Sequence, residues 1–405
     1  MRRRRLLGHA LLTPFPLLGA LSGCGGSLGA ASTQAEVIAP GGVTVPMQRQ
    51  QHPHVSVAVR ANGQPLRFLL DTGADHNVLT PRTAAMLGLP LSEERVPSSG
   101  AEASAPPVPW TFLDDLAVGD AVHLRRAVAF VIPLPDEFTC DGILGATFWR
   151  AFAARLDYGR GELTLAPVGR LAPPPGAVRL RLQVLPGGKM LVQASAAGHT
   201  GWFSVDTGDG GAVTLFRPAV ERLDLRTALQ PSVRMPTGVS VGGTTWADVA
   251  RLPVFELGPW QWPQVPVHLS LATGGLFGSE AWMGNLGGEL WRRFAVTIDV
   301  AGGALYLEPQ AASSEPFAGP RSGLVARWNG ERFEVLHVVA GSPADQAGVR
   351  PGDALLAVQG HGLGASDAGW LREQLAAAPG TALALRLRAA DGAERQATLV
   401  LRELV

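Results

Sequence analysis

Short runs of alternating apolar and polar residues, separated by glycine turns, dominate the chain from residue 51 onward. Residues 55–59 alternate as a half-buried strand does, Asn62-Gly63 is typical of a hairpin turn, and 66–70 is an apolar returning strand. The same order recurs further along the chain, at 190–194, Ala197-Gly198-His199 and 201–205. The pattern therefore predicts a mainly β protein in which one strand–turn–strand unit occurs twice.

The repetition extends to two glycine motifs downstream of these units. Gly142-Ile143-Leu144-Gly145 matches Gly284-Asn285-Leu286-Gly287, and a short helix is expected after each, over 146–152 and 288–294. Gly63 and Gly198 lie 135 positions apart, whereas Gly142 and Gly284 lie 142 apart, so the second copy has a loop insertion of seven residues. We therefore expect two β lobes, over 51–172 and 173–310, divided near the proline-rich stretch 173–176.

Each repeated unit ends in the same triplet, Asp71-Thr72-Gly73 in the first copy and Asp206-Thr207-Gly208 in the second. A single Asp-Gly turn is common in proteins and indicates no function by itself. Two such turns after matching strands instead indicate a pair of carboxyl groups, those of Asp71 and Asp206. Two neighbouring carboxyls that share one proton can act as base and acid on one water molecule, and this chemistry needs neither a metal nor a cofactor.

This arrangement resembles the retropepsin-like aspartic proteases, above all their bacterial relatives with two lobes in one chain. The resemblance rests on Asp71-Thr72-Gly73-Ala74 followed by Gly142-Ile143-Leu144-Gly145, and it covers residues 51–310. It implies two retropepsin-like β lobes related by pseudo-twofold symmetry, and an endopeptidase activity with Asp71 and Asp206 as the catalytic residues. The implied substrate is an extended polypeptide, held between the lobes as an added strand.

The same resemblance implies roles for the residues around the two carboxyls. Thr72 and Thr207 would join the two loops by hydrogen bonds, and Gly73 and Gly208 would let the backbone approach the carboxylates. The strand and turn beneath each loop would be formed by Gly142, Ile143, Leu144, Gly145, Gly284, Leu286 and Gly287. The Gly-, Pro- and Ser-rich segments 98–110 and 238–246 are the candidates for flaps over the substrate.

The residue after each triplet distinguishes the two halves. Ala74 follows the first triplet, whereas the charged Asp209 follows the second. If Asp209 points at the carboxyl pair, its charge raises the pKa values of the pair, and Asp209→Ala moves the acid limb of the pH–rate profile down. If Asp209 points to solvent, the substitution leaves the profile unchanged.

The N-terminal segment has the order of a bacterial export signal. Arginines at positions 2–5 precede an apolar stretch over 6–21 that is shorter than the roughly 20 residues of a membrane span. Leu21-Ser22-Gly23-Cys24 resembles a lipobox, which implies removal of residues 1–23 and a lipid on Cys24; an ordinary signal peptide is the alternative. Gly25 favours an outer-membrane anchor with the protein facing the periplasm. Residues 24–50 are expected to form a flexible tether.

A different pattern begins after a predicted linker over 311–320. Residues 321–405 resemble a bacterial PDZ domain, through Gly341-Ser342-Pro343-Ala344, Ala347-Gly348-Val349, Pro351-Gly352-Asp353 and Val358-Gln359-Gly360. The resemblance implies a β-rich module with two helices, in which a C-terminal peptide adds as a strand. Its carboxylate would meet backbone N–H groups near Gly323, Leu324 and Val325.

The strands of this module are expected at 335–339, 381–389 and 395–402, with a helix from the N-cap Ser366 to Ala378. Leu371 and Leu375 stand four positions apart on that helix and so share one face. The spacing is compatible with lining a peptide groove and equally with plain core packing.

Composition excludes several classes of function. The chain has 34 basic and 34 acidic side chains among 405 residues, so electrostatics gives no case for a nucleic-acid partner. Cys140 has no second cysteine to pair with once Cys24 is acylated, and we expect it to be a small buried residue. His52, His54 and His76 lack a fixed ligand spacing, so we expect surface histidines and no metal site.

These observations favour a membrane-anchored aspartic endopeptidase whose PDZ domain binds substrate or regulates access. One alternative is a non-catalytic lipoprotein that binds peptides or acts as a scaffold and retains the protease fold. Another is a dimer in which Asp71 of one chain pairs with Asp71 of a second.

Overall fold

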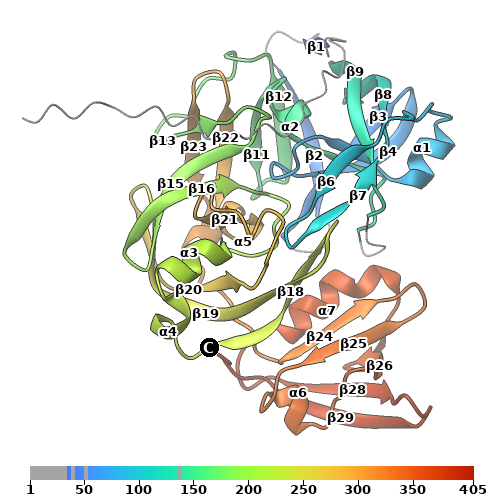
Figure 1. Cartoon of the computed structure of the whole chain (residues 1–405), viewed down its shortest axis with the longest axis vertical. Helices are drawn as coiled ribbons and strands as arrows, with labels where there is room; N and C mark the ends of the chain where they lie inside the picture. The colour runs from blue at the N-terminus through green and yellow to red at the C-terminus, as the bar shows by residue number, and fades with distance from the viewer. Residues whose placement is uncertain (1–33, 38–41, 50–52, 135–137) are drawn as a thin grey trace, which may run out of the picture. The chain divides into compact units, whose positions relative to one another are not determined.

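A computed structural model describes residues 34–37, 42–49, 53–134 and 138–405, as drawn in Figure 1. The predicted signal peptide, Cys24 and His52 lie outside these residues. No helix in the described ranges is both long enough and apolar enough to cross a membrane.

The first copy of the repeat is built almost entirely of strands, which confirms the mainly β prediction. Its elements are β3 (Val55–Ala61), β4 (Gln64–Leu70), β5 (Asn77–Leu79), α1 (Pro81–Met86), β6 (Val96–Ser99), β7 (Ser104–Val108), β8 (Trp110–Val118), β9 (Val122–Val131), β10 (Gly142–Leu144), α2 (Ala146–Trp149), β11 (Ala153–Asp157) and β12 (Glu162–Ala166). The expected hairpin turn joins β3 to β4, where Asn62 and Gly63 both have positive φ.

The second copy has a similar order of elements, with one further short helix and with three strands, β18 to β20, where the first copy has the four strands β6 to β9. It consists of β15 (Met190–Ala196), β16 (His199–Val205), β17 (Val213–Leu215), α3 (Arg217–Arg222), α4 (Leu225–Ala228), β18 (Val233–Ser240), β19 (Gly243–Leu257), β20 (Trp260–Ser270), β21 (Gly284–Leu286), α5 (Gly288–Trp291), β22 (Phe294–Asp299) and β23 (Ala304–Pro309). The helices expected after the glycine motifs are present as α2 and α5, each shorter than predicted.

The glycine motif of each copy lies between the same two strands. β10 runs parallel to β4 and antiparallel to β5, and β21 runs parallel to β16 and antiparallel to β17. All three residues of β10 and of β21 are buried. In both copies, the loop after the long strand β4 or β16 is therefore held beside a buried three-residue strand.

Strands of the two copies join in one sheet. Its order runs β2–β12–β11–β22–β23–β13, and the β11–β22 pair links the copies, as Figure 1 shows. The elements outside the copies are β1 (Gln34–Val37), β2 (Val43–Arg49), β13 (Val178–Arg181), β14 (Gln183–Val184) and the 3-10 helix η1 (Ala311–Ser314). One hydrophobic cluster runs through both copies, including the fully buried Trp149 and Trp291.

The prediction of a flexible tether over 24–50 is wrong where the structure describes that range. β1 pairs with β9, and β2 pairs with both β12 and β3. Residues 43–46 of β2 pair with β12, and residues 47–49 pair with β3. Val43, Val45 and Met47 also pack in or against the hydrophobic core. Ladder hydrogen bonds and core packing together place this segment in the sheet.

Residues 321–405 have a separate hydrophobic core with Leu324, Phe333 and Leu371 at its centre. The elements of this C-terminal module are β24 (Leu324–Trp328), β25 (Phe333–Val338), α6 (Pro343–Gln346), β26 (Ala354–Val358), β27 (His361–Gly362), the 3-10 helix η2 (Ala365–Asp367), α7 (Ala368–Leu375), β28 (Ala382–Arg388) and β29 (Glu394–Val400). The expected strands are present as β25, β28 and β29.

Two expectations for the module need correction. Ser366 lies inside η2 and does not cap α7, because Asp367 occupies the N-cap position of that helix. Leu371 is 2% exposed and belongs to the core, so the core-packing alternative holds for it. Leu375 is only partly buried and packs against the same core.

Candidate active site

Each Asp-Thr-Gly triplet forms the loop after a buried strand, and the neighbouring glycine motif holds its first residue. Asp71 N donates to Leu144 O (3.2 Å), and Asp206 N donates to Leu286 O (3.0 Å). The carbonyls of Leu144 and Leu286 also accept the indole N–H of a buried tryptophan, Trp149 and Trp291 respectively. Strand, motif and tryptophan thus hold each aspartate in the same way.

The two loops are joined to each other through their threonines. Thr72 N donates to Thr207 Oγ1 (3.0 Å), and Thr207 N donates to Thr72 Oγ1 (3.1 Å). Thr72 Oγ1 also donates to Val205 O, and Thr207 Oγ1 donates to Leu70 O. Both threonines are buried, so this reciprocal set has the geometry that the expected cross-brace requires.

The two carboxyl groups face each other across the glycines of the triplets. A Cβ added to Gly73 would lie 2.2 Å from Asp206 Oδ1, and one added to Gly208 would lie 2.4 Å from Asp71 Cγ. The carboxyl group of each aspartate therefore packs against the glycine of the other triplet. Only a residue without a side chain fits at either position.

Each carboxyl is oriented by backbone donors of its own loop. Asp71 Oδ1 accepts from the N–H groups of Gly73 (2.8 Å) and Ala74 (2.9 Å). Asp206 Oδ1 accepts from the N–H groups of Gly208 (3.0 Å) and Asp209 (3.1 Å). The carboxyl planes are therefore fixed before any ligand binds.

Burial and mutual repulsion prevent both carboxyls from being charged together. Burial raises the pKa of Asp71, and the positive charge of Lys189 opposes this rise. The pKa of Asp206 lies well above its usual range because of burial, the charge of Asp71 and the charge of Asp209. The pair therefore holds one proton between its two carboxyls, and the rise in pKa is the larger for Asp206.

An aspartyl protease family model matches residues 57–148. The matched segment contains the triplet at Asp71 and the glycine motif at Gly142, and it supports a peptidase-type, hydrolytic function. No curated protein matches the chain.

Solved structures that are similar to this chain include a soybean globulin and a retropepsin-like protease. Basic 7S globulin from soybean shares 11% identity over 70% of this chain and 98% of its own, with a TM-score of 0.39. A retropepsin-like aspartic protease from Rickettsia conorii shares 20% identity over 33% of this chain and 93% of its own, with a TM-score of 0.23.

The second glycine motif contributes a contact that the sequence did not indicate. Asn285 Nδ2 donates to Asp206 Oδ2 (2.8 Å), while Asn285 Oδ1 accepts from the hydroxyl of Ser204. Ser204 Oγ accepts in turn from Trp282 Nε1 (3.1 Å), so a chain of hydrogen bonds leads from this indole to Asp206. In the first copy the matching residue is the apolar Ile143, so only Asp206 receives such a bond. A polar residue in an otherwise apolar motif was the available signal.

Asp209 follows neither of the two alternatives predicted for it. Its carboxylate turns back within its own half, where Oδ1 accepts from Gly211 N (2.8 Å) and Oδ2 accepts from Thr214 Oγ1 (2.9 Å). Its charge nevertheless raises the pKa of Asp206. The effect therefore falls on the carboxyl that keeps the proton.

We expect Asp209→Asn to move the alkaline limb of the pH–rate profile to lower pH, by up to about one unit. The substitution removes the negative charge that raises the pKa of Asp206, so Asp206 loses its proton earlier. The measurement is kcat/KM for peptide cleavage as a function of pH. Thr214→Val is the matched control, because it removes a hydrogen bond to Asp209 and keeps the charge. An alkaline limb unchanged in Asp209→Asn contradicts this role.

Both flap candidates are hairpins whose tips touch. The first is the β6–β7 hairpin, and the second is the turn end of the β18–β19 hairpin, where β18 ends and β19 begins. Ala101 N donates to Ser240 Oγ (3.2 Å), and Trp246 N donates to Glu102 Oε1 (2.9 Å). The two copies are thus joined at these hairpins as well as at the triplets.

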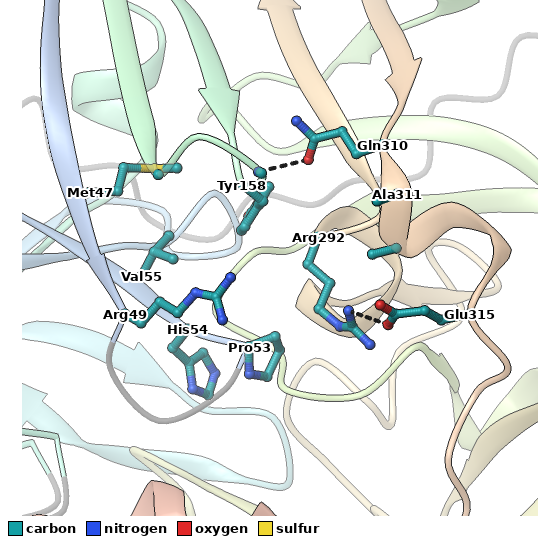
Figure 2. Close-up of a pocket in the computed structure, with 13 residues that line it drawn as sticks. Met47, Arg49, Pro53, His54, Val55, Tyr158, Arg292, Gln310, Ala311 and Glu315 are labelled. Carbon is teal, nitrogen blue, oxygen red and sulfur yellow. Dashed lines mark hydrogen bonds and ion pairs between the residues drawn. The ribbon is translucent and has the colours of Figure 1, made fainter.

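A pocket of about 290 Å³ has His54 in its lining but neither carboxyl of the pair (Figure 2). Its lining includes Met47, Arg49, Pro53, Tyr158, Arg292 and Gln310, but neither Asp71 nor Asp206. The guanidinium of Arg292, which lines the pocket, is already paired with Glu289 and Glu315. This pocket is therefore not the candidate active site.

The expectation of surface histidines is wrong for His54. It is 6% exposed, and its Nε2 donates to Gly208 O (3.0 Å). His76 is half-buried and stacks on Phe130. Within the described ranges, no group of three His, Cys, Asp or Glu side chains is arranged to hold a metal ion. Cys140 is half-buried, and burial raises the pKa of its thiol to about 11.

Proposed function

We propose that this protein is an aspartic endopeptidase that hydrolyses peptide bonds through Asp71, Asp206 and an activated water. The observation that carries the proposal is the mutual packing of each carboxyl against the glycine of the other triplet. The crossed threonines support it, because they hold the two loops in this relation. The two copies would then be related by a pseudo-twofold axis between the aspartates.

In this mechanism the oxygen of the water molecule attacks the peptide carbonyl carbon. The charged Asp71 accepts a proton from this water as the new C–O bond forms. The protonated Asp206 gives its proton to the carbonyl oxygen, so a neutral tetrahedral diol forms. When the diol collapses, one of its hydroxyls returns a proton to Asp206 and the proton held by Asp71 passes to the leaving nitrogen. The C–N bond breaks, and the carboxyl pair is restored with one proton.

The substrate would be an extended polypeptide lying between the two copies. The joined hairpins β6–β7 and β18–β19 are our candidates for its cover. Opening them requires breaking the contacts of Ala101 and Glu102 with the second copy. A substrate with little structure of its own would enter most easily.

The C-terminal module would act as a PDZ domain that binds a peptide or regulates access. β24 is the end strand of its sheet, which suits the addition of a peptide strand. Leu324 N already donates to Ser322 Oγ, so one of the expected carboxylate donors is engaged. His337 Nε2 donates to Arg234 O, and its ring packs edge-on to Trp246, which links the module to β18 and β19.

We also propose an outer-membrane lipid anchor on Cys24.

Incubating the purified chain with an unfolded protein over a range of pH tests this function. We expect internal cleavage by material that elutes as a monomer, because one chain supplies both carboxyls. The products are identified by mass spectrometry of the new termini. Absence of cleavage at every pH favours the non-catalytic scaffold instead.

A further inference from the structure

Besides the two threonines, a second pair of side chains, His54 and Lys189, forms hydrogen bonds from one copy to the other. His54 precedes β3 and Lys189 precedes β15, and the two residues are 135 positions apart, as Asp71 and Asp206 are. His54 Nε2 donates to the carbonyl of Gly208, and Lys189 Nζ donates to the carbonyl of Gly73. Each copy thus places a nitrogen donor on the glycine carbonyl of the other copy's triplet.

The residues just before this pair are also placed alike. A Cβ added to Gly188 would lie 2.8 Å from Ala146 Cβ, at the start of α2. A Cβ added to Gly288, at the start of α5, would lie 2.8 Å from Pro53 Cγ. In both copies, the segment entering the first strand therefore packs against the helix after the other copy's glycine motif. This packing places His54 next to the carbonyl of Gly208 and Lys189 next to the carbonyl of Gly73.

One peptide group connects each of these donors to a carboxyl of the pair. The Gly73 carbonyl that accepts from Lys189 belongs to the same peptide group as Ala74 N–H, which donates to Asp71 Oδ1. The Gly208 carbonyl that accepts from His54 shares its peptide group with Asp209 N–H, which donates to Asp206 Oδ1. A cation at the carbonyl end polarises the peptide and strengthens its N–H as a donor.

The two donors differ in charge. Lys189 is the only lysine of the chain, its side chain is 11% exposed, and Nζ also pairs with Asp75 Oδ1 (2.9 Å). An ammonium group stays charged over the whole range in which carboxyls titrate, whereas an imidazole is charged only below about pH 6.5. Lys189 therefore brings a permanent positive charge to the Gly73 carbonyl, whereas a neutral imidazole at the Gly208 carbonyl brings none.

We propose that Lys189 is a positioning residue that places the negative charge of the pair on Asp71 and leaves the proton on Asp206. This inference rests on the proposed function and adds the residue that makes its two carboxyls unequal. The surrounding charges agree with it. The positive charge of Lys189 lowers the pKa of both carboxyls. For Asp71 it is the largest effect after burial, whereas for Asp206 the raising effects of Asp71 and Asp209 are both larger than that of Lys189.

Three other titratable groups, Asp75, His76 and His268, lie near the carboxyl pair or its neighbours. The charge of Asp75 raises the pKa of Asp71, in opposition to Lys189. His76 interacts with Asp75 and with Arg150, and burial lowers its pKa. His268 lies beside Asp209, and burial lowers its pKa as well. Among these groups, only Lys189 combines a positive charge with a peptide link to a carboxyl of the pair.

The single lysine permits a direct test that does not depend on activity. Protein grown with ε-¹³C lysine gives one side-chain signal, whose chemical shift we would follow with pH. We expect a step in the chemical shift as Asp71 loses its proton. This step should disappear in Asp71→Asn and persist in Asp75→Asn, which removes the salt bridge to Asp75. A signal with no step that depends on Asp71 overturns the inference, even if wild type cleaves peptides.

Kinetics give the second readout. Lys189→Gln keeps a donor for the Gly73 carbonyl and removes the charge, so we expect the acid limb of kcat/KM to move up by about one pH unit. On the acid side this is about a tenfold loss of kcat/KM. Lys189→Arg keeps the charge, so the acid limb of its kcat/KM profile should lie at the same pH as in wild type. If the acid limb of Lys189→Gln also lies at the wild-type pH, and its thermal unfolding is unchanged, the inference is overturned while the proposed function stands.

Discussion

Replacing Asp71 by Asn is expected to abolish peptide cleavage, lowering kcat/KM by roughly 10⁴-fold. Asparagine retains an oxygen for the N–H groups of Gly73 and Ala74, so the loop keeps its shape. It cannot accept the proton of the attacking water, which is the step assigned to Asp71. Initial rates on a fluorogenic peptide, measured at the pH optimum of wild type, give the comparison.

The matched control is Asp114→Asn, which makes the same chemical change at an exposed carboxyl on β8. It should cleave like wild type. Asp206→Asn should be as inactive as Asp71→Asn, and mixing the two variants should not restore activity. A site built from Asp71 of two chains would leave Asp206→Asn active, and this result would contradict catalysis within one chain.

Adding one methyl group at Gly208 is expected to cost both activity and stability. In Gly208→Ala the new Cβ would lie 2.4 Å from Asp71 Cγ, closer than real contacts allow, so a loop must move. Overpacking of this kind costs about 1–3 kcal/mol of unfolding free energy. A shift of the carboxyl by even ~1 Å lowers the rate by about 10²-fold, because the reacting groups lose their alignment.

Gly210→Ala provides the matched control two residues away. Gly210 is exposed, and the nearest atom to its added Cβ is His54 Cε1 at 3.4 Å, an ordinary contact. We expect Gly210→Ala to keep both activity and melting temperature. Thermal unfolding and kcat/KM are measured for both variants. If Gly208→Ala behaves like Gly210→Ala, the carboxyl of Asp71 does not pack against Gly208 in solution.

The elements that local pattern predicted best are those whose signals lie within a few residues. The hairpin turn at Asn62-Gly63 was predicted because this dipeptide tolerates positive φ, and the turn at Ala197-Gly198 was predicted from its match to the first copy. All four residues have positive φ. Strand β2 was missed because its placement depends on hydrogen bonds to β12, more than a hundred positions away in the chain. The start of α7 was misplaced for a smaller reason, since a 3-10 turn precedes it.

The sequence by itself determined the two Asp-Thr-Gly triplets, their repeated frame and the strands that lead into them. The chain order also showed that Asp209 has no charged counterpart in the first copy, but two further differences between the halves became visible only in the fold. Asn285 bonds to Asp206 across two strands, and Lys189 reaches the loop of Asp71 from the other copy. The physical reason is that periodicity and turn chemistry act between neighbours in the chain. The charge of a carboxyl depends instead on groups close in space, and folding brings these together from distant segments.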